Sequence, residues 1–198
     1  MNLICGIDEA GRGPLAGPVC AAAVILGNGF PLELLSDSKK LSSSKREKAQ
    51  KIILSKCLFY GIGWASNIEI DEINILKASL LAMKRAFDTM LLQYNAFSDK
   101  TFSDSQAAGK VHAIIDGLYV PYISAPCRAV VKADSKFPEV MAASILAKTA
   151  RDRIMDVYSI FYPEYGYEKH KGYPTKAHRL AIAQYGFSPI QRNTFKVK

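Results

Sequence analysis

The hydrophobic residues of the chain fall into two kinds of pattern, short continuous runs and longer periodic segments. Five short runs are rich in apolar residues and end at glycine, proline or charged positions, which is typical of buried β-strands. The first run is expected to end at Asp8, just before a loop rich in glycine and proline. The pattern predicts strands over residues 2–8, 19–26, 57–66, 111–116 and 127–132.

Longer segments are predicted as α-helices. The clearest extends from Ile73 to Tyr94, where apolar residues recur at steps of three and four, the period of one helix face. Pro138 suits the first turn of another helix, and Gly186 suits the end of the last one. The other helices are expected over residues 43–56, 138–158 and 175–186, and the stretches 96–110 and 161–174 are expected to be loops.

The alternation of strands and helices predicts an α/β fold. The early strands are close enough in sequence to pair as antiparallel neighbours, whereas the later ones are separated by helices and are expected to be parallel. We therefore predict a mixed β-sheet flanked by helices. The length of 198 residues fits a single domain, 1–198, on which residues 159–198 pack as a C-terminal helix and tail.

Composition narrows the class of protein. Hydrophobic residues make up 49% of the chain, which is enough for a real core. No apolar run approaches the roughly 18 residues of a membrane span and no secretory signal pattern is visible, so we expect a cytoplasmic protein without a membrane partner. Lysine and arginine (26) exceed aspartate and glutamate (18), and the net charge of +8 favours a polyanionic partner such as nucleic acid.

Four acidic residues, Asp8, Glu9, Asp116 and Asp134, each end or directly follow an apolar strand-like run. In an α/β sheet, binding sites gather just outside the strand ends, so these side chains are expected to converge. Clustered carboxylates repel one another unless protons or cations neutralise them, and Mg²⁺ prefers such oxygen ligands. Two ions about 4 Å apart could activate water against a phosphodiester. The alternative is that each acid is an ordinary turn residue.

The loop after the first acids contains Gly11 and Gly13 within the stretch GIDEAGRGPLAGPV. Glycine has no Cβ and permits positive φ, so backbone N–H groups of this loop could approach an anion closely. A tight turn between two strands would have the same composition. Because no helix follows the glycines, the stretch is not a dinucleotide-binding motif.

Six segments carry a family likeness. They are GIDEAGRGPLAGPV (6–19), LSDSKKLSSSKRE (35–47), IIDG (114–117), VKADSK (131–136), AASILAKTARD (142–152) and HKGYPTKAH (170–178). Any one of them could arise by chance, but all six occur in the order of one family and cover nearly the whole chain. Together they resemble prokaryotic ribonuclease HII, the type 2 ribonuclease H.

The resemblance implies a fold and a metal site. The implied fold is the ribonuclease H-like mixed sheet flanked by helices, with a helical C-terminal extension. Asp8, Glu9, Asp116 and Asp134 match the family's four catalytic carboxylates. In the family these residues bind two Mg²⁺ or Mn²⁺ ions in the presence of substrate, so the same cofactors are expected here.

The resemblance also implies a substrate site. Gly11, Arg12 and Gly13 match the family's GRG motif, whose backbone contacts the 2′-hydroxyl and neighbouring phosphate of the ribonucleotide. Tyr173 matches the tyrosine that packs against that nucleotide. The 2′-hydroxyl is the group that distinguishes RNA from DNA at one position, and backbone groups can bind it without regard to the base.

The implied reaction is hydrolysis of the phosphodiester 5′ of a ribonucleotide, leaving 5′-phosphate and 3′-hydroxyl ends. The family cuts RNA in RNA–DNA hybrids and single ribonucleotides embedded in duplex DNA. These activities serve ribonucleotide removal from the genome and degradation of RNA primers during replication. The expected partners are therefore both kinds of duplex, and the expected oligomeric state is a monomer.

Basic residues provide candidate contacts to the flanking phosphates. Lys39, Lys40, Arg46, Lys171 and the basic tail could give salt-dependent binding without sequence preference. The alternative for each is a solvated surface side chain. His170 lies near the tyrosine motif and could position a phosphate, or it could be a core or surface residue.

Two other functions remain open at the level of sequence. One is a nuclease that cuts long hybrids but not a single ribonucleotide, as in the related type HIII enzymes. The other is a basic nucleic-acid-binding module without catalysis, in which the acids are turn residues. Dependence on a divalent metal separates the second from both nucleases, because a plain binding module needs none.

Overall fold

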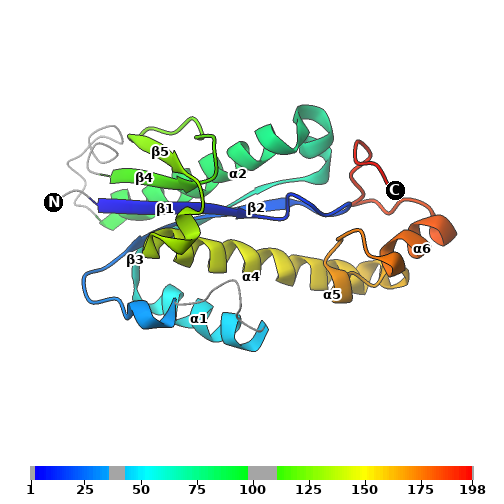
Figure 1. Ribbon diagram of the computed structural model, residues 1–198, viewed down its shortest axis with the longest axis horizontal. Coiled ribbons are helices and arrows are strands. Elements are labelled where there is room, and N and C mark those ends of the chain that lie inside the picture. Colours follow the sequence, from blue (N-terminus) through cyan, green and yellow to red (C-terminus); the bar gives the residue numbers. More distant parts are fainter. Residues whose placement is uncertain (1–2, 36–42, 98–110, 198) are drawn as a thin grey trace.

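The computed structural model describes residues 3–35, 43–97 and 111–197, and these contain a five-stranded sheet in the order β3-β2-β1-β4-β5 (Figure 1). β2 pairs antiparallel with β1 and β3, whereas β4 pairs parallel with β1 and β5. The predicted mixed sheet is therefore confirmed. The strands are β1 (Leu3–Ala10), β2 (Val19–Leu26), β3 (Cys57–Ala65), β4 (Val111–Asp116) and β5 (Cys127–Val130).

The first strand is longer than the sequence indicated. The prediction that it ends at Asp8 is wrong, because the ladder with β2 continues until Ala10 lies opposite Cys20. The antiparallel partner supplies hydrogen bonds up to the glycine loop, which outweighs the local preference of acidic residues for turns. Lys39 and Lys40, expected to contact phosphate, lie outside the described residues.

The predicted long helices are all present. They are α1 (Ser43–Lys56), α2 (Asn67–Phe97), α4 (Pro138–Phe161) and α6 (Lys176–Tyr185). Short helical turns follow β2, β5 and α4: η1 (Leu32–Leu34), η3 (Ala133–Ser135) and η4 (Pro163–Tyr165). The loop expected over 161–174 also contains a short helix, α5 (Tyr167–His170). Within the described stretches, none of the helices combines the length and apolar character that a membrane crossing requires.

The sheet lies between two helical layers. Figure 1 shows α2 on one face and α1 with α4 on the other. Ile7 of β1 packs in the core under α2, whereas Val24 of β2 packs in the core under α4. Gly6 lets the start of α4 approach β1 closely, because a Cβ there would lie 2.1 Å from the Glu139 carbonyl carbon. The first turns of α4 are therefore held directly over the strand that carries Asp8.

The C-terminal segment packs against the N-terminal loop. Tyr167 of α5 and Ile190 of the tail share a buried cluster with Ala16 and with Met155 of α4. The tail also forms an isolated antiparallel bridge between Gln191 and Ala16. Figure 1 shows α6 and the tail beside the loop that leaves β1, so segments from both ends of the chain meet at one end of the sheet.

Candidate active site

Three of the four expected acids form a cluster. Asp8 lies near the end of β1, Asp116 is the last residue of β4, and Asp134 lies in η3. One carboxylate oxygen from each lies within 4.8 Å of the others. β1 and β4 are parallel neighbours, so their carboxyl ends lie at the same edge of the sheet. Asp116 also accepts a hydrogen bond of 2.7 Å from the Ala133 amide, which holds the turn that carries Asp134.

The cluster is buried and electrostatically costly. Asp8 is only 6% exposed and Asp134 only 4%. Burial raises the pKa of Asp8 well above its ordinary value, and the neighbouring charges of Glu9 and Asp116 raise it further. A hydrogen bond from the Ser144 side chain of α4 partly opposes this rise in the pKa of Asp8. The fold therefore brings carboxylates together where only a proton or a cation stabilises them.

Glu9 lies beside the cluster rather than within it. Its Oε1 pairs with the Arg12 guanidinium at 3.3 Å. Burial raises the pKa of Glu9, and the neighbouring Arg12 lowers it. The charge of Asp116 also raises the pKa of Glu9, so the two carboxylates lie close enough to repel each other. In the described part of the chain, the buried Glu9 Oε2 has no hydrogen-bond partner. One oxygen of Glu9 is therefore available to a ligand at the edge of the cluster.

The donor set of the cluster fits a divalent cation. Carboxylate oxygens are the ligands that Mg²⁺ and Mn²⁺ prefer. A cation at this position would offset the burial and the repulsion that together raise the pKa of Asp8. Asp8, Asp116 and Asp134 are the residues that could hold it, with Glu9 Oε2 close by.

A pocket of about 380 Å³ opens next to Glu9. The glycine loop forms one wall, from Gly11 to Gly13, and Tyr173 forms another. Residues of two helices complete the lining: Arg46 of α1, and Ser144, Ile145 and Lys148 of α4. The structure thus places the expected GRG segment, the expected tyrosine and one expected cation around a single cavity.

Tyr173 is a surface residue of this pocket rather than part of the core. It is 40% exposed, and its ring edge faces Gly13, where a Cβ would lie 3.5 Å from Cε1. The Lys148 ammonium lies 5.8 Å from the ring centroid and the Arg151 guanidinium 6.0 Å. The ring therefore lies near two cationic groups, one of them buried, opposite the glycine loop.

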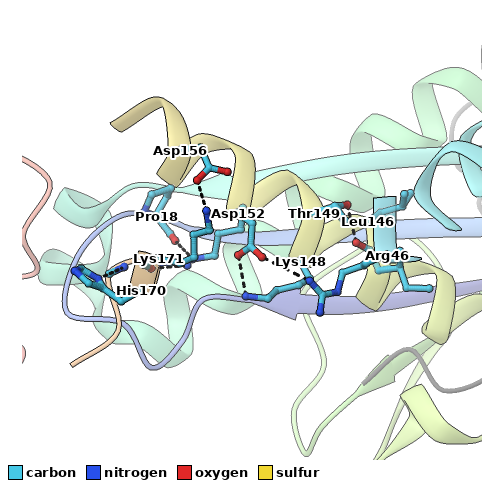
Figure 2. Close-up of polar contacts among 12 residues, drawn as sticks. Pro18, Arg46, Leu146, Lys148, Thr149, Asp152, Asp156, His170 and Lys171 are labelled. Carbon is cyan, nitrogen blue, oxygen red and sulfur yellow. Dashed lines mark hydrogen bonds and ion pairs between the residues drawn. The ribbon is translucent and has the colours of Figure 1, made fainter. Parts of the chain in front are cut away.

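Two cations at the pocket are held by one acid of α4. Asp152 accepts a hydrogen bond from Lys148 at 2.8 Å and lies 3.8 Å from Arg46 (Figure 2). Lys171, also expected to contact phosphate, lies outside the lining of this pocket, and its ammonium pairs with Asp156. Of the expected cations that the structure describes, Arg46 faces the pocket and Lys171 does not.

Sequence reasoning missed two buried arginines beneath the glycine loop. Arg151 of α4 donates to the carbonyl oxygens of Pro18 at 3.1 Å and Ala16 at 3.2 Å, and Arg192 of the tail donates to other carbonyls of the same loop. Arg192 was predicted only as part of a basic tail. Nothing in the composition of that tail distinguishes a buried arginine from a solvated one, because its partners lie about 180 residues away in sequence.

A mixed five-stranded sheet flanked by helices, with acids gathered at adjacent strand ends, is the arrangement of the ribonuclease H-like fold. Ribonuclease H2 from Pyrococcus horikoshii OT3 superposes with a TM-score of 0.70 at 27% identity, covering 98% of this chain and 94% of that one. Bst-RNase HIII in complex with Mn²⁺ superposes with a TM-score of 0.72 at 16% identity, covering 99% of this chain and 68% of that one. The fold expectation is therefore confirmed.

The family follows from the sequence comparison. The family profile Ribonuclease HII matches residues 5–198. Ribonuclease HII from Treponema denticola is 56% identical over 199 residues, which cover 99% of both chains. The chain belongs to the ribonuclease HII family, and its class is that of a type 2 ribonuclease H endonuclease.

Proposed function

We propose that this protein hydrolyses the phosphodiester 5′ of a ribonucleotide, both in RNA–DNA hybrids and at single ribonucleotides embedded in duplex DNA. The observation that carries the proposal is the position of the acid cluster next to a pocket walled by the glycine loop and Tyr173. The cluster supplies a place for the chemistry, and the pocket supplies a place for one sugar. A plain binding module would have no use for three carboxylates within 4.8 Å of one another, two of them buried and one half-buried.

The acids take the role of metal ligands in this proposal. Asp8, Asp116 and Asp134 hold divalent cations, and Glu9 Oε2 provides a fourth carboxylate at the side of the pocket. Bound there, two Mg²⁺ or Mn²⁺ ions would activate a water molecule and stabilise the leaving oxygen, giving 5′-phosphate and 3′-hydroxyl ends. The Mn²⁺ in the Bst-RNase HIII complex supports a divalent ion for this fold.

The glycine loop takes the role of the ribose detector. Within the described residues, no hydrogen bond to another part of the chain uses the amides of Arg12 and Gly13, so both N–H groups are available to a ligand in the pocket. An oxygen of the 2′-hydroxyl or of the adjacent phosphate is the acceptor that suits them. Tyr173 stands across the cavity, where its ring can pack against the same nucleotide.

Cations around the pocket take the role of phosphate contacts. Arg12 is exposed at its mouth, and Arg46 and Lys148 line its wall. Lys171 is proposed as a more distant phosphate contact, because its ammonium lies on the same side of α4 as Lys148 (Figure 2). We propose a monomer as the active form. Ribonucleotide removal and RNA primer degradation are the cellular roles that such cleavage would serve.

Asp116→Asn tests the assignment of the cluster. The substitution removes one negative charge and keeps an oxygen that can accept from the Ala133 amide, so the fold is expected to persist. Cleavage should become undetectable, while binding of a duplex with one ribonucleotide stays within about threefold of the original protein, since the pocket is unchanged. Full cleavage by Asp116→Asn would remove this residue from the site.

A second candidate function is cleavage of long hybrids alone, as in type HIII enzymes, and the 16%-identical HIII structure shares the fold. A duplex with one ribonucleotide and an all-RNA/DNA hybrid separate the two candidates when they are compared at equal concentration. The pocket beside Glu9 accommodates one sugar, so we expect both substrates to be cut. Cleavage of the hybrid alone would favour the second candidate.

A further inference from the structure

The guanidinium of Arg192 lies under the glycine loop and is fully buried, with 0% of the residue exposed. It donates to four backbone carbonyls of that loop, those of Gly11 at 2.6 Å, Arg12 at 3.0 Å, Pro14 at 2.8 Å and Gly17 at 2.8 Å. The described residues contain no carboxylate that pairs with it. Since a buried charge requires compensation, these carbonyl oxygens are its main stabilising partners.

The direction of these carbonyls determines the direction of the loop amides. In a planar trans peptide unit, the C=O and the following N–H point in opposite directions. The Gly11 and Arg12 carbonyls point at Arg192, so the N–H groups of Arg12 and Gly13 point away from it. Those residues line the pocket, and no other part of the described chain accepts from these two amides. The buried guanidinium thus turns two donors toward the place where substrate binds.

We propose that Arg192 is a positioning residue for substrate recognition, which holds the Arg12 and Gly13 amides toward the scissile ribonucleotide. The inference rests on the proposed role of the glycine loop as the ribose detector. Arginine suits this task because its planar guanidinium carries five N–H donors in a fixed arrangement. Lysine has one nitrogen and cannot reach four carbonyls at once. Arg192 therefore acts on the substrate only through the loop.

The tail that carries Arg192 is anchored independently of the loop. Asp71 of α2 accepts hydrogen bonds from the Asn193 amide at 2.8 Å and the Thr194 amide at 2.9 Å. The Phe195 ring packs 5.1 Å from the Arg192 guanidinium. Asp71 touches neither the glycine loop nor the pocket. Its charge favours the protonated guanidinium of Arg192 without forming an ion pair with it. Asp71→Asn keeps all four carbonyl contacts of Arg192, so it weakens the tail while leaving the guanidinium in place.

The test compares Arg192→Lys with two control variants in the full chain. Asp71→Asn weakens the anchor of the tail, and Arg179→Lys makes the same chemical change at an exposed site on α6. For each variant we would measure the melting temperature, kcat and KM on a duplex with one ribonucleotide. Hydrogen–deuterium exchange of the peptide spanning residues 11–17 would report on the loop without substrate.

Arg192→Lys should raise KM about tenfold, the effect of weakening one or two hydrogen bonds to the substrate, and should speed exchange in residues 11–17. Asp71→Asn should lower the melting temperature but leave KM unchanged, and Arg179→Lys should match the original protein. Arg192→Gln, which is uncharged and shorter, should change KM in the same direction as Arg192→Lys.

Three results would overturn the proposal. The first is an Arg192→Lys variant whose KM and whose hydrogen–deuterium exchange in residues 11–17 both equal those of the original protein. The second is an equal rise in KM in Asp71→Asn, which would make the effect one of general stability. The third is unfolding of both Arg192 variants while Asp71→Asn stays folded, which would make Arg192 a residue of the fold alone. If the original protein leaves a lone ribonucleotide uncut, the proposed function fails, and the exchange measurement still decides whether Arg192 holds the loop.

Discussion

At the scale of single residues, the site is built from groups that the fold stabilises poorly. Asp8 is buried, and both burial and its acidic neighbours raise its pKa. Between its ordinary pKa of about 3.9 and its higher pKa in the folded state, the folded chain binds more protons than the unfolded chain. The contribution of Asp8 to the stability of the metal-free protein should therefore increase as pH falls through its folded pKa, and should be smallest at pH 8.

Asp8→Asn should accordingly stabilise the metal-free protein while abolishing cleavage. The amide removes the buried charge and can still accept the 2.8 Å hydrogen bond from the Glu9 amide. We expect a higher melting temperature than that of the original protein in EDTA at pH 8. Asp88→Asn is a suitable control, because that acid pairs with Lys84 at an exposed position of α2. A lower melting temperature for Asp8→Asn would contradict this account.

The two glycines of the GRG segment should differ sharply. Gly11 has φ of 99°, and a Cβ there would lie 2.0 Å from Arg151 Nε. Gly11→Ala should destabilise the fold by about 2–4 kcal/mol, from a left-handed conformation and a steric clash together. At Gly13 a Cβ would meet only the Tyr173 ring edge at 3.5 Å. The denaturation midpoint of Gly13→Ala should therefore equal that of the original protein. Equal denaturation midpoints for the two variants would refute the prediction.

The sequence pattern predicted that acids at strand ends would converge, whereas their role as metal ligands stays a prediction. Asp116 and Asp134 were identified because each follows an apolar run, and the structure places both in the cluster with Asp8. Arg192 was beyond reach, because its partners are backbone carbonyls of a distant loop and leave no pattern in side-chain types. Burial of a charged side chain depends on tertiary contacts, which hydrophobic periodicity does not contain.

At the scale of elements, hydrophobic periodicity predicted the long helices and the strands. It did not predict a very short helix or a strand extension that depends on a neighbouring strand. α5 has only four residues, too few for one face to show a period. The extension of β1 to Ala10 depends on its partner β2, whose register is not visible in β1 itself. The last helix ends before Gly186 as predicted. Its N-terminal cap, in which the Thr175 hydroxyl accepts a hydrogen bond from the His178 amide, was not predicted.

The junction of α5 and α6 contains a stacked pair of buried histidines. The rings of His170 and His178 lie 4.6 Å apart, and His178 Nδ1 is hydrogen-bonded to the Tyr173 carbonyl at 3.0 Å. Burial lowers the pKa of both histidines. The structure therefore favours a core role for His170 over a contact to phosphate, the two alternatives that the sequence allowed. The histidine pair also supports the backbone of Tyr173.

This junction should make the fold sensitive to acid. Unfolded histidines have a pKa of about 6.5, so below that pH the unfolded chain binds more protons than the folded one. The contribution of the two histidines to the free energy of unfolding should fall as pH falls below about 6.5, and His178→Asn should remove part of that fall. Urea titrations at several pH values measure it, with His112→Gln at an exposed position of β4 as the control. A slope unchanged by His178→Asn would exclude this histidine as a cause.

At the scale of the whole molecule, the two ends of the chain build one site. The glycine loop follows β1, and Arg192 of the tail holds it from below. We infer that residues 1–198 form one domain, because this contact and the shared cluster of Ala16 with Ile190 leave no independent C-terminal unit. The chain carries a net charge of +8, and Arg12, Arg46 and Lys148 line the same pocket as Glu9, the acid beside the cluster.

Binding of substrate should depend on salt in proportion to the phosphates contacted. Arg12, Arg46 and Lys148 line the pocket, so log Kd should rise with log salt concentration with a slope of about 3. In the inactive Asp116→Asn background, Lys148→Gln should lower that slope by about 1. Lys84→Gln, on the outer surface of α2, should leave it unchanged. A slope insensitive to Lys148→Gln would remove Lys148 from the interface.

The most direct test of the central claim is cleavage of a DNA duplex that carries one ribonucleotide, with the products mapped at single-nucleotide resolution. The account predicts incision on the 5′ side of the ribonucleotide with Mg²⁺ or Mn²⁺, ends of 5′-phosphate and 3′-hydroxyl, and no product in EDTA. An all-DNA duplex of the same sequence should stay intact. Cleavage that persists in EDTA, or binding without cleavage in every metal, would contradict the assignment of Asp8, Asp116 and Asp134 as the catalytic centre.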